Sequence, residues 1–524
     1  MARRVAVATC GDTEMNPMKS STSEDLSPLK RCGLVVLMVL ALTLAIRNES
    51  FWTDELSSAF LASQNNWQHL VSCLGSLGSE AQMPLHFVWL WFWSRFFGTG
   101  EWALRAANIP WAILAVVSWI GLLRKGSYGM WATGLLISPF ICYYMNEARP
   151  YVMTFATSML ALYALESLCA VSSETCGSKN TVALVAGIGL CAGASMLNLI
   201  LVPSLIAYLM MRLSGAAVLK GLRNWMRYNL GTLGSLLVLL GGIAAYYLFT
   251  LVQGHGGQRE PFTWINASYA IYEMLGFGGL GAPRILLREL SVASVLSRYG
   301  TTLVLGLMVW GLVVAVMWFR RREILQDPIV RAAWTGLVVG ILTLAGSAIF
   351  FKVSLWGRHF MVVMPLLFLG LAGALDTARK EAPLASKLIL LGLIGLFAVS
   401  SVRQRGLDDY RKDPLREAVA ELREIVRQSP TEPVVMVSSP LALWYYGGDI
   451  TSVVTPVFGW SDARSRRWQS VHSEYVILVH RADKFDSQGM WASSFGAKKA
   501  KLIWQSGNIK IYHIGADAGS KGLL

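Results

Sequence analysis

The residues best suited to chemistry lie in polar clusters at the ends of apolar runs. The first cluster is Trp52-Thr53-Asp54-Glu55, directly after the first apolar run. Two adjacent carboxylates at the lip of a membrane cavity suit a general base aimed at a substrate hydroxyl. The same residues also suit the start of a helix, where Thr or Asp caps the backbone and acids are favoured in the first turn. The residue types leave both interpretations open.

Two later clusters have a similar setting. Glu147-Ala148-Arg149-Pro150-Tyr151 lies between two apolar runs, and Lys352 is followed closely by Gly357-Arg358-His359. Arginine and lysine suit the phosphate of a lipid carrier. Alternatively, Glu147 and Arg149 form a plain ion pair, and the later cations reach the lipid headgroups. Together the three clusters predict a cavity at the outer membrane surface, with acids on one wall and bases on the other.

The elements that position these residues must be membrane helices. Of the 524 residues, 54% are hydrophobic and only 15% are charged, whereas a soluble domain carries about 25% charge. Apolar runs recur from Leu34 to Ser400, and several approach the ~20 residues that cross a bilayer. Ionisable residues at membrane level are costly and are therefore functional candidates.

Basic clusters indicate which ends of the runs face the cytoplasm. Arg124-Lys125, Arg320 to Arg322 and Arg379-Lys380 follow apolar runs, as the positive-inside rule predicts for cytoplasmic loops. This placement explains the net charge of +14 without nucleic-acid binding. It predicts a cytoplasmic N-terminal tail at 1–30 and about eleven spans: 33–47, 106–123, 128–145, 151–171, 181–198, 199–212, 229–252, 300–319, 332–351, 358–377 and 385–401.

Three regions are then expected outside the membrane core on the outer face. A long loop at 48–105 contains an apolar stretch, Pro84 to Phe97, that is too short to cross and predicts an interfacial helix. A second loop covers 253–299. The tail at 402–524 predicts a small extracytoplasmic α/β domain, with an amphipathic helix over 413–428 and strands near 434–437, 475–479 and 509–514.

The ordered set of motifs resembles the GT-C class of glycosyltransferases, in particular the group of protein O-mannosyltransferases and lipid A aminoarabinose transferases. The resemblance covers 31–401 and rests on Trp52 to Glu55, Met83-Pro84, Glu101 to Arg105, Glu147 to Tyr151 and Gly357 to His359 with Met364-Pro365. Two departures are Met83-Pro84 in place of a Pro-Pro pair and His359 in place of a tyrosine.

This resemblance implies roles for individual residues. Asp54 corresponds to the acid that deprotonates the acceptor hydroxyl, and its neighbour Glu55 orients the acceptor or a metal. Glu80 and Glu147 are candidates for a second acid. The carrier phosphate is expected to be held by basic residues, namely Arg105, Arg149, Lys352, Arg358 and His359. No metal is required, although a divalent ion near Asp54 and Glu55 is compatible with the pattern.

The implied activity is transfer of a hexose or pentose from a polyprenyl-phosphate donor to an acceptor hydroxyl, with inversion. The implied location is the bacterial inner membrane, with the active site and C-terminal domain facing the periplasm. The partners are the sugar-loaded carrier, an acceptor lipid, glycan or protein, and the bilayer. The alternative from another class is a transporter or flippase for lipid-linked sugars, although transporters typically show internal repeats and midplane sites. An assembly protein whose outer domain does the work is a further alternative.

Overall fold

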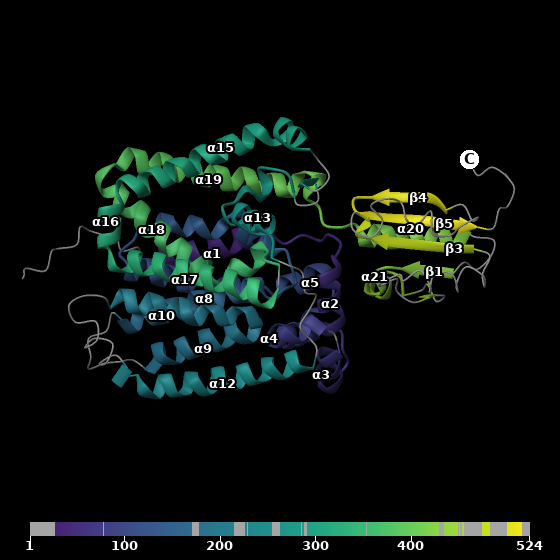
Figure 1. The fold of residues 1–524 in the computed structure, drawn as a ribbon, viewed down its shortest axis with the longest axis horizontal. Coiled ribbons are helices and arrows are strands. Elements are labelled where there is room, and N and C mark those ends of the chain that lie inside the picture. Colours follow the sequence, from purple (N-terminus) through teal and green to yellow (C-terminus); the bar gives the residue numbers. More distant parts are fainter. Residues whose placement is uncertain are drawn as a thin grey trace, which may run out of the picture.

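The computed structural model describes residues 27–76, 78–169, 178–213, 226–227, 229–253, 262–283, 286–287, 291–352, 354–428, 434–448, 450, 453–454, 474–482 and 500–515. Helices form a bundle, and a small α/β domain stands at one end of it (Figure 1). Most of the predicted N-terminal tail and parts of the predicted loop 253–299 lie outside the described residues.

The bundle consists of long helices joined by short ones. The long helices are α1 Pro28–Thr43, α6 Ile109–Lys125, α8 Tyr151–Cys169, α9 Ser178–Ala194, α10 Leu201–Arg212, α12 Leu230–Val252, α15 Val292–Phe319, α17 Pro328–Phe351, α18 Met364–Glu381 and α19 Pro383–Gly406. The short ones are η2 Met130–Ile137, α7 Pro139–Met145, η3 Met196–Ile200, α13 Trp264–Met274, η4 Phe277–Gly279, α16 Arg321–Gln326 and η5 Gly357–Val362.

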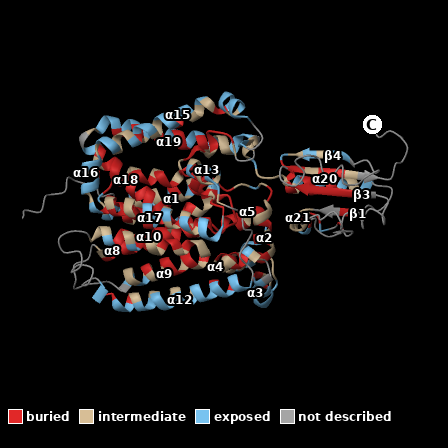
Figure 2. Ribbon diagram, viewed as in Figure 1, coloured by how far each residue is buried: buried red, intermediate tan, exposed pale blue. Residues whose placement is uncertain are grey.

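Length and composition identify six helices able to cross a membrane among the described residues. In α12 and α15 only 11% of the most apolar window is buried, and Figure 2 shows both helices largely exposed at the outside of the bundle. Apolar faces of this kind suit contact with lipid. The eleven spans expected from the sequence are not established by helix length, because α9 and α10 are shorter.

The expected span at 128–145 is wrong as a single helix. The structure divides it into η2 and α7 at Ser138, which is extended (φ −56°, ψ 146°). The break has a local cause, because Pro139 disfavours a helical conformation at the preceding residue. The Ser138 side chain then accepts a hydrogen bond from the backbone N–H of Ile141 and caps α7.

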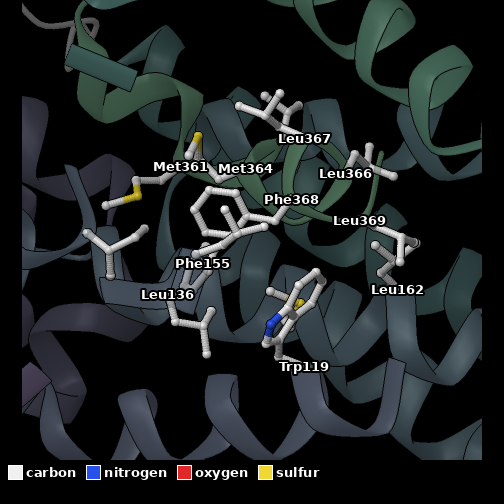
Figure 3. Packing of buried hydrophobic residues seen from close by; sticks show 14 of the residues in the cluster. Trp119, Leu136, Phe155, Leu162, Met361, Met364, Leu366, Leu367, Phe368 and Leu369 are labelled. Atoms are coloured by element: carbon white, nitrogen blue, oxygen red, sulfur yellow. The ribbon is translucent and has the colours of Figure 1, made fainter. Parts of the chain in front are cut away.

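The core of the bundle is apolar and aromatic. Phe368 of α18 packs against Trp119 of α6 and Phe155 of α8, with ring centroids 6.3 and 5.9 Å apart. Figure 3 shows these rings among leucine and methionine side chains. Packing of this core fixes the ends of the helices, and the candidate chemical residues lie at those ends.

The first outer loop is folded into short helices: α2 Thr53–Ala62, α3 Trp67–Ser76, η1 Gly78–Gln82, α4 Pro84–Phe97 and α5 Glu101–Ala106. The predicted helix at 84–97 is confirmed with the same bounds. These helices lie at the end of the bundle that faces the α/β domain, whereas α16, beside Arg320 to Arg322, lies at the opposite end (Figure 1).

The C-terminal domain contains η6 Asp408–Tyr410, α20 Leu415–Gln428, α21 Pro440–Tyr446 and five strands: β1 Val434–Val437, β2 Val453–Val454, β3 Glu474–His480, β4 Ala500–Ser506 and β5 Ile509–Gly515. The strand order is β2-β1-β3-β5-β4. Strand β1 pairs in parallel with β2 and β3, and β5 pairs antiparallel with β3 and β4. The predicted α/β character is confirmed, including the helix and the three strands near their predicted positions.

This domain shares a hydrophobic cluster with the first outer loop. Phe51 and Leu56 belong to the same cluster as Leu415, Val419 and Leu422 of α20, and all five side chains are fully buried. Helix α2 also contacts α21. The C-terminal domain is therefore packed on the loop that carries Asp54 and Glu55.

Candidate active site

Asp54 lies in the first turn of α2 and faces a cation that follows 304 residues later in the chain. Its Oδ2 accepts a hydrogen bond from Nη1 of Arg358 in η5 at 3.0 Å. The same Nη1 is 3.3 Å from the Tyr151 hydroxyl, to which it donates. The side chains of Asp54 and Arg358 are 32% and 27% exposed. The structure thus brings the first and third sequence clusters into an ion pair that a ligand can reach.

Glu55 occupies the opposite environment, fully buried beneath α2. Its Oε1 accepts from Arg105 Nε and the Ala148 backbone N–H, both at 2.9 Å. Its Oε2 accepts from Arg105 Nη2 at 2.8 Å and Lys412 Nζ at 2.9 Å. Burial alone would raise the pKa of Glu55, but the charges of Lys412 and Arg105 and these hydrogen bonds lower it to about 2. Glu55 is therefore an ionised structural anchor, and the expected catalytic role does not fit its surroundings.

Arg105 is similarly committed. Besides its two bonds to Glu55, it donates to the carbonyl oxygens of Arg47, Glu49 and Ser50 at 2.9, 2.7 and 3.3 Å. A guanidinium has five N–H donors, and five acceptors surround this one, whose side chain is 0% exposed. The prediction that Arg105 holds the carrier phosphate does not fit, because no donor remains for a phosphate.

Glu147 lies in the segment between α7 and α8 and is only 2% exposed. Its Oε2 has no hydrogen-bond partner. Burial raises its pKa to about 7, helped by the negative charges of Glu55 and Asp54 and opposed by Lys412 and Arg358. A carboxyl group with a pKa near neutrality and a vacant oxygen is suited to exchange a proton with a bound substrate.

Arg149 joins the Asp54 segment to Glu80. Its Nη1 donates to the Asp54 carbonyl oxygen at 3.2 Å and lies 3.5 Å from Glu80 Oε1. Its Nη2 lies 3.6 Å from the Met83 sulfur, while its buried Nε has no partner. Glu80 also accepts from the Ser79 hydroxyl at 2.8 Å. Both predicted residues are therefore in the cluster around Asp54.

Lys352 and His359 are placed differently from the prediction. Lys352 is exposed at the C-terminal end of α17, and within the described part of the chain it has no hydrogen bond or ion pair. His359 accepts the backbone N–H of Trp356 through Nδ1 at 3.2 Å. Burial, with the charge of Arg358, lowers the pKa of His359 to about 3. A neutral imidazole that holds the turn of η5 supplies no positive charge to a phosphate.

The C-terminal domain contributes residues that the sequence did not single out. Lys412 binds Glu55 and also donates to the Asn146 carbonyl oxygen at 2.6 Å. His480 at the end of β3 lies 2.8 Å from Asp413 Oδ2 and 3.2 Å from the Thr53 hydroxyl. The run Arg411-Lys412-Asp413 shortly after the last apolar segment was the only signal, and it carries no recognisable spacing.

Further contacts fasten this domain to the first outer loop. Glu101 accepts from Arg416 Nη1 at 2.8 Å and from the Tyr446 hydroxyl at 2.5 Å. The Tyr446 hydroxyl also accepts the Phe51 backbone N–H at 2.7 Å. These contacts hold the C-terminal domain against Phe51, directly before α2, and against Glu101 at the start of α5.

The residues do not suit a divalent ion held between Asp54 and Glu55. Among the described residues, no three His, Cys, Asp or Glu side chains gather in a way that could hold a metal. Both oxygens of Glu55 already accept hydrogen bonds from N–H donors. A metal there would have to displace two buried cations, so no catalytic step is assigned to one.

Sequence comparison provides no relative, since neither a protein-family model nor a curated protein matches the chain. Solved structures do match. ArnT from Cupriavidus metallidurans bound to undecaprenyl phosphate has a TM-score of 0.53 and 13% identity over 94% of this chain and 100% of that chain. ArnT in the apo state has a TM-score of 0.51 and 12% identity over 92% and 98% of the two chains.

An oligosaccharyltransferase from Archaeoglobus fulgidus has a TM-score of 0.45 and 11% identity, over 93% of this chain and 74% of that chain. The identities are low, so the likeness to ArnT concerns the fold. It extends over nearly the whole chain. This chain therefore has the fold of the GT-C glycosyltransferases, the class that includes ArnT.

Proposed function

We propose that the protein is a membrane glycosyltransferase that moves a sugar from a polyprenyl-phosphate donor to an acceptor hydroxyl. The observation that carries the proposal is the accessible ion pair between Asp54 and Arg358, at the end of the bundle where the outer-loop helices lie. It occurs in a chain with the fold of ArnT, which has been crystallised with undecaprenyl phosphate. That relative supports a polyprenyl-phosphate donor for this chain.

In this proposal Arg358 binds the carrier phosphate. A guanidinium presents paired donors to phosphate oxygens, and Arg358 is one of the two cations that reach Asp54. When the phosphate takes over its hydrogen bonds, Arg358 releases Asp54. The freed carboxylate becomes a stronger base, because an opposite charge at close range lowers a carboxyl pKa and its loss raises it.

The reaction then proceeds in one displacement. Asp54 accepts the proton of the acceptor hydroxyl as that oxygen attacks the anomeric carbon of the sugar. The bond between the anomeric carbon and the carrier phosphate oxygen breaks, and polyprenyl phosphate leaves with the electron pair. Arg358 stabilises the charge that develops on the phosphate. Attack from the face opposite the leaving group inverts the anomeric carbon.

The neighbouring residues support this step. The vacant Oε2 of Glu147 is assigned to a hydrogen bond with the sugar or the acceptor. Arg149 holds the Asp54 backbone and is itself oriented by Glu80. We assign Lys352 no contact with the phosphate, since it is exposed without a partner among the described residues.

We further propose that this end of the bundle faces the periplasm of a bacterial inner membrane. The support is the location of α16, beside Arg320 to Arg322, at the end away from α2 and the C-terminal domain. Basic clusters are retained on the cytoplasmic side. The same orientation places the C-terminal domain outside.

The test uses full-length protein in detergent with a panel of radiolabelled polyprenyl-phosphate sugars. Wild type is compared with Asp54→Asn, Arg358→Gln and the matched control Asp409→Asn. Asp409 has a comparable ion pair with Arg298 at 2.5 Å but lies outside the cluster. We expect wild type and the control to release or transfer sugar, Asp54→Asn to bind carrier without turnover, and Arg358→Gln to lose carrier binding.

Carrier binding without turnover of any donor by wild type would contradict the proposal. Movement of intact lipid-linked sugar across proteoliposomes would then identify a transporter. Full activity of Asp54→Asn would instead remove Asp54 from the role of base and point to Glu147.

A further inference from the structure

The segment that leads into α2 contributes to a basic pocket outside the proposed donor site. The pocket is a small, partly open hollow between the ends of α1, α7 and α19 and the segment 410–412, with a cavity volume of about 20 Å³. Its charged lining consists of Arg47, Arg405, Lys412 and Glu49. Lys412 is already paired with Glu55, so Arg47 and Arg405 against the single carboxylate of Glu49 leave one positive charge in excess.

The arginines of this pocket lack enough acceptors. Within the described part of the chain, the side chain of Arg405 has no hydrogen-bond or ion-pair partner. Arg47 donates to the Gln404 carbonyl oxygen at 2.8 Å, but its buried Nε has none, and its nearest carboxylate, Glu49, is 3.9 Å away. The charges of Arg405, Arg105 and Arg411 all act on Arg47. An anion between Arg47 and Arg405 would supply acceptors and relieve this repulsion.

The pocket is contiguous with the proposed catalytic cluster. Lys412 lines the pocket and reaches Glu55 and the Asn146 carbonyl oxygen. Asn146, another lining residue, directly precedes Glu147. Tyr143 also lines the pocket and is 38% exposed. A molecule with its anionic group in the pocket can therefore present a neighbouring group to Glu147.

We propose that this pocket binds a phosphate group of the acceptor, so that the acceptor is a phosphorylated molecule whose hydroxyl is presented beside Glu147. The acceptor role rests on the proposed function, whereas phosphate binding by Arg47 and Arg405 does not. Two sources share this chemistry, a lipid with a phosphate headgroup and a soluble phosphomonoester.

The test measures phosphate binding without relying on catalysis. Full-length protein in neutral detergent is titrated with inorganic phosphate at constant ionic strength, and thermal unfolding is followed, since a ligand that binds the folded state raises the melting temperature. Every sample carries Arg358→Gln, which removes the donor phosphate site. To this background are added Arg405→Gln or the control Lys501→Gln, which removes an exposed charge on β4.

We expect phosphate to stabilise the background variant and Lys501→Gln equally. Arg405→Gln is expected to weaken the affinity about tenfold or more, because a hydrogen bond to a charged group contributes about 1.5–3 kcal/mol. Arg405 is exposed and has no partner in the described chain, so this change leaves the fold intact. Equal affinity for phosphate in the background and Arg405→Gln variants would overturn the proposal, as would no stabilisation of either.

A second arm identifies the source. The titration is repeated in nanodiscs of phosphatidylcholine with and without phosphatidic acid. Weaker apparent affinity for phosphate in the presence of phosphatidic acid supports a lipid acceptor, and unchanged affinity supports a soluble one. If Arg405→Gln loses phosphate while wild type turns over no polyprenyl-phosphate sugar, the pocket stands and the transferase proposal fails.

Discussion

Two neighbouring carboxylates in α2 lie in contrasting regions. Glu55 is fully buried and accepts four hydrogen bonds, two from Arg105, one from Lys412 and one from a backbone N–H. Asp54 is one third exposed and has a single side-chain partner, Arg358. Successive residues of a helix point about 100° apart, so the Glu55 carboxylate faces the protein interior and the Asp54 carboxylate faces Arg358 and is partly exposed.

The contrast assigns a structural role to Glu55 and a chemical role to Asp54. The buried network joins α2, α5 and the C-terminal domain through Glu55, Arg105 and Lys412. Such a network is costly to bury and strongly destabilising when one partner is lost. Asp54 is not part of this buried network, but the network holds α2 and therefore the position of Asp54. A pair of acids that looks like one motif in the sequence thus performs two tasks.

The largest effect is expected from Glu55→Gln, which leaves Arg105 and Lys412 buried without a counter-charge. We expect the free energy of unfolding to fall by about 3–5 kcal/mol. We also expect the variant to lose its transfer activity. The measurement is chemical unfolding in detergent. The control is Glu323, a partly exposed member of an ion pair with Arg320: Glu323→Gln should change stability by less than about 1 kcal/mol.

The Glu55 network also has a pH dependence. Its folded pKa of about 2 lies below the ordinary glutamate pKa of 4.5. A lowered pKa stabilises the fold above the unfolded value, and this contribution is lost as pH falls from 4.5 towards 2. Wild type should therefore lose more stability in that window than Glu55→Gln does. Parallel acid unfolding of the two proteins would contradict the role of Glu55.

Asp54→Asn is expected to affect the rate and leave the fold unchanged. Removal of a general base lowers the rate by about 10²–10⁴-fold, whereas an ion pair about one third exposed contributes roughly 1 kcal/mol. Sugar transfer and thermal unfolding are measured on the same preparation. If Asp54→Asn is inactive because it is unfolded, Asp54 stabilises the fold as Glu55 does, and the proposed difference between the two residues is wrong.

Glu147→Gln tests whether the raised pKa of Glu147 makes stability depend on pH. Its folded pKa of about 7 lies above the ordinary glutamate pKa of 4.5. A raised pKa makes the wild type lose stability as pH rises from about 4.5 to 7, by roughly 3 kcal/mol in total. The variant should therefore be more stable than wild type at pH 8 and nearly equal at pH 5. An equal difference at both pH values would show that Glu147 is not titrating.

The smallest effect is expected from His480→Ala, which cuts the link between Asp413 and Thr53 at the start of α2. We expect a loss of about 1 kcal/mol in stability and a decrease of a few-fold in transfer rate with unchanged carrier binding. The control is His69→Ala in α3, where the histidine is exposed. Equal rates in the two variants would mean that the C-terminal domain does not position α2.

The sequence by itself determined the membrane class, the helix Pro84–Phe97 and the α/β character of the C-terminal domain. These follow from local quantities: the length of apolar runs, the period of apolar residues and the charge of their flanks. Strands β2 and β4 were missed, because β2 has two residues and β4 carries Lys501 and Gln505 among its apolar residues. Pro139 is a local signal for the break at Ser138, but the continuous apolar run around it favours a single span.

Only the tertiary structure decided which charged residues have a structural role and which are available for catalysis. Asp54, Glu147, Arg149 and Arg358 are brought together from segments up to 304 residues apart, while Arg105 and Glu55 are committed to each other and to Lys412. Burial and partner number separate a catalytic carboxylate from a structural one, and neither is a property of the residue type or its neighbours in the chain. Both depend on which face of α2 the C-terminal domain covers.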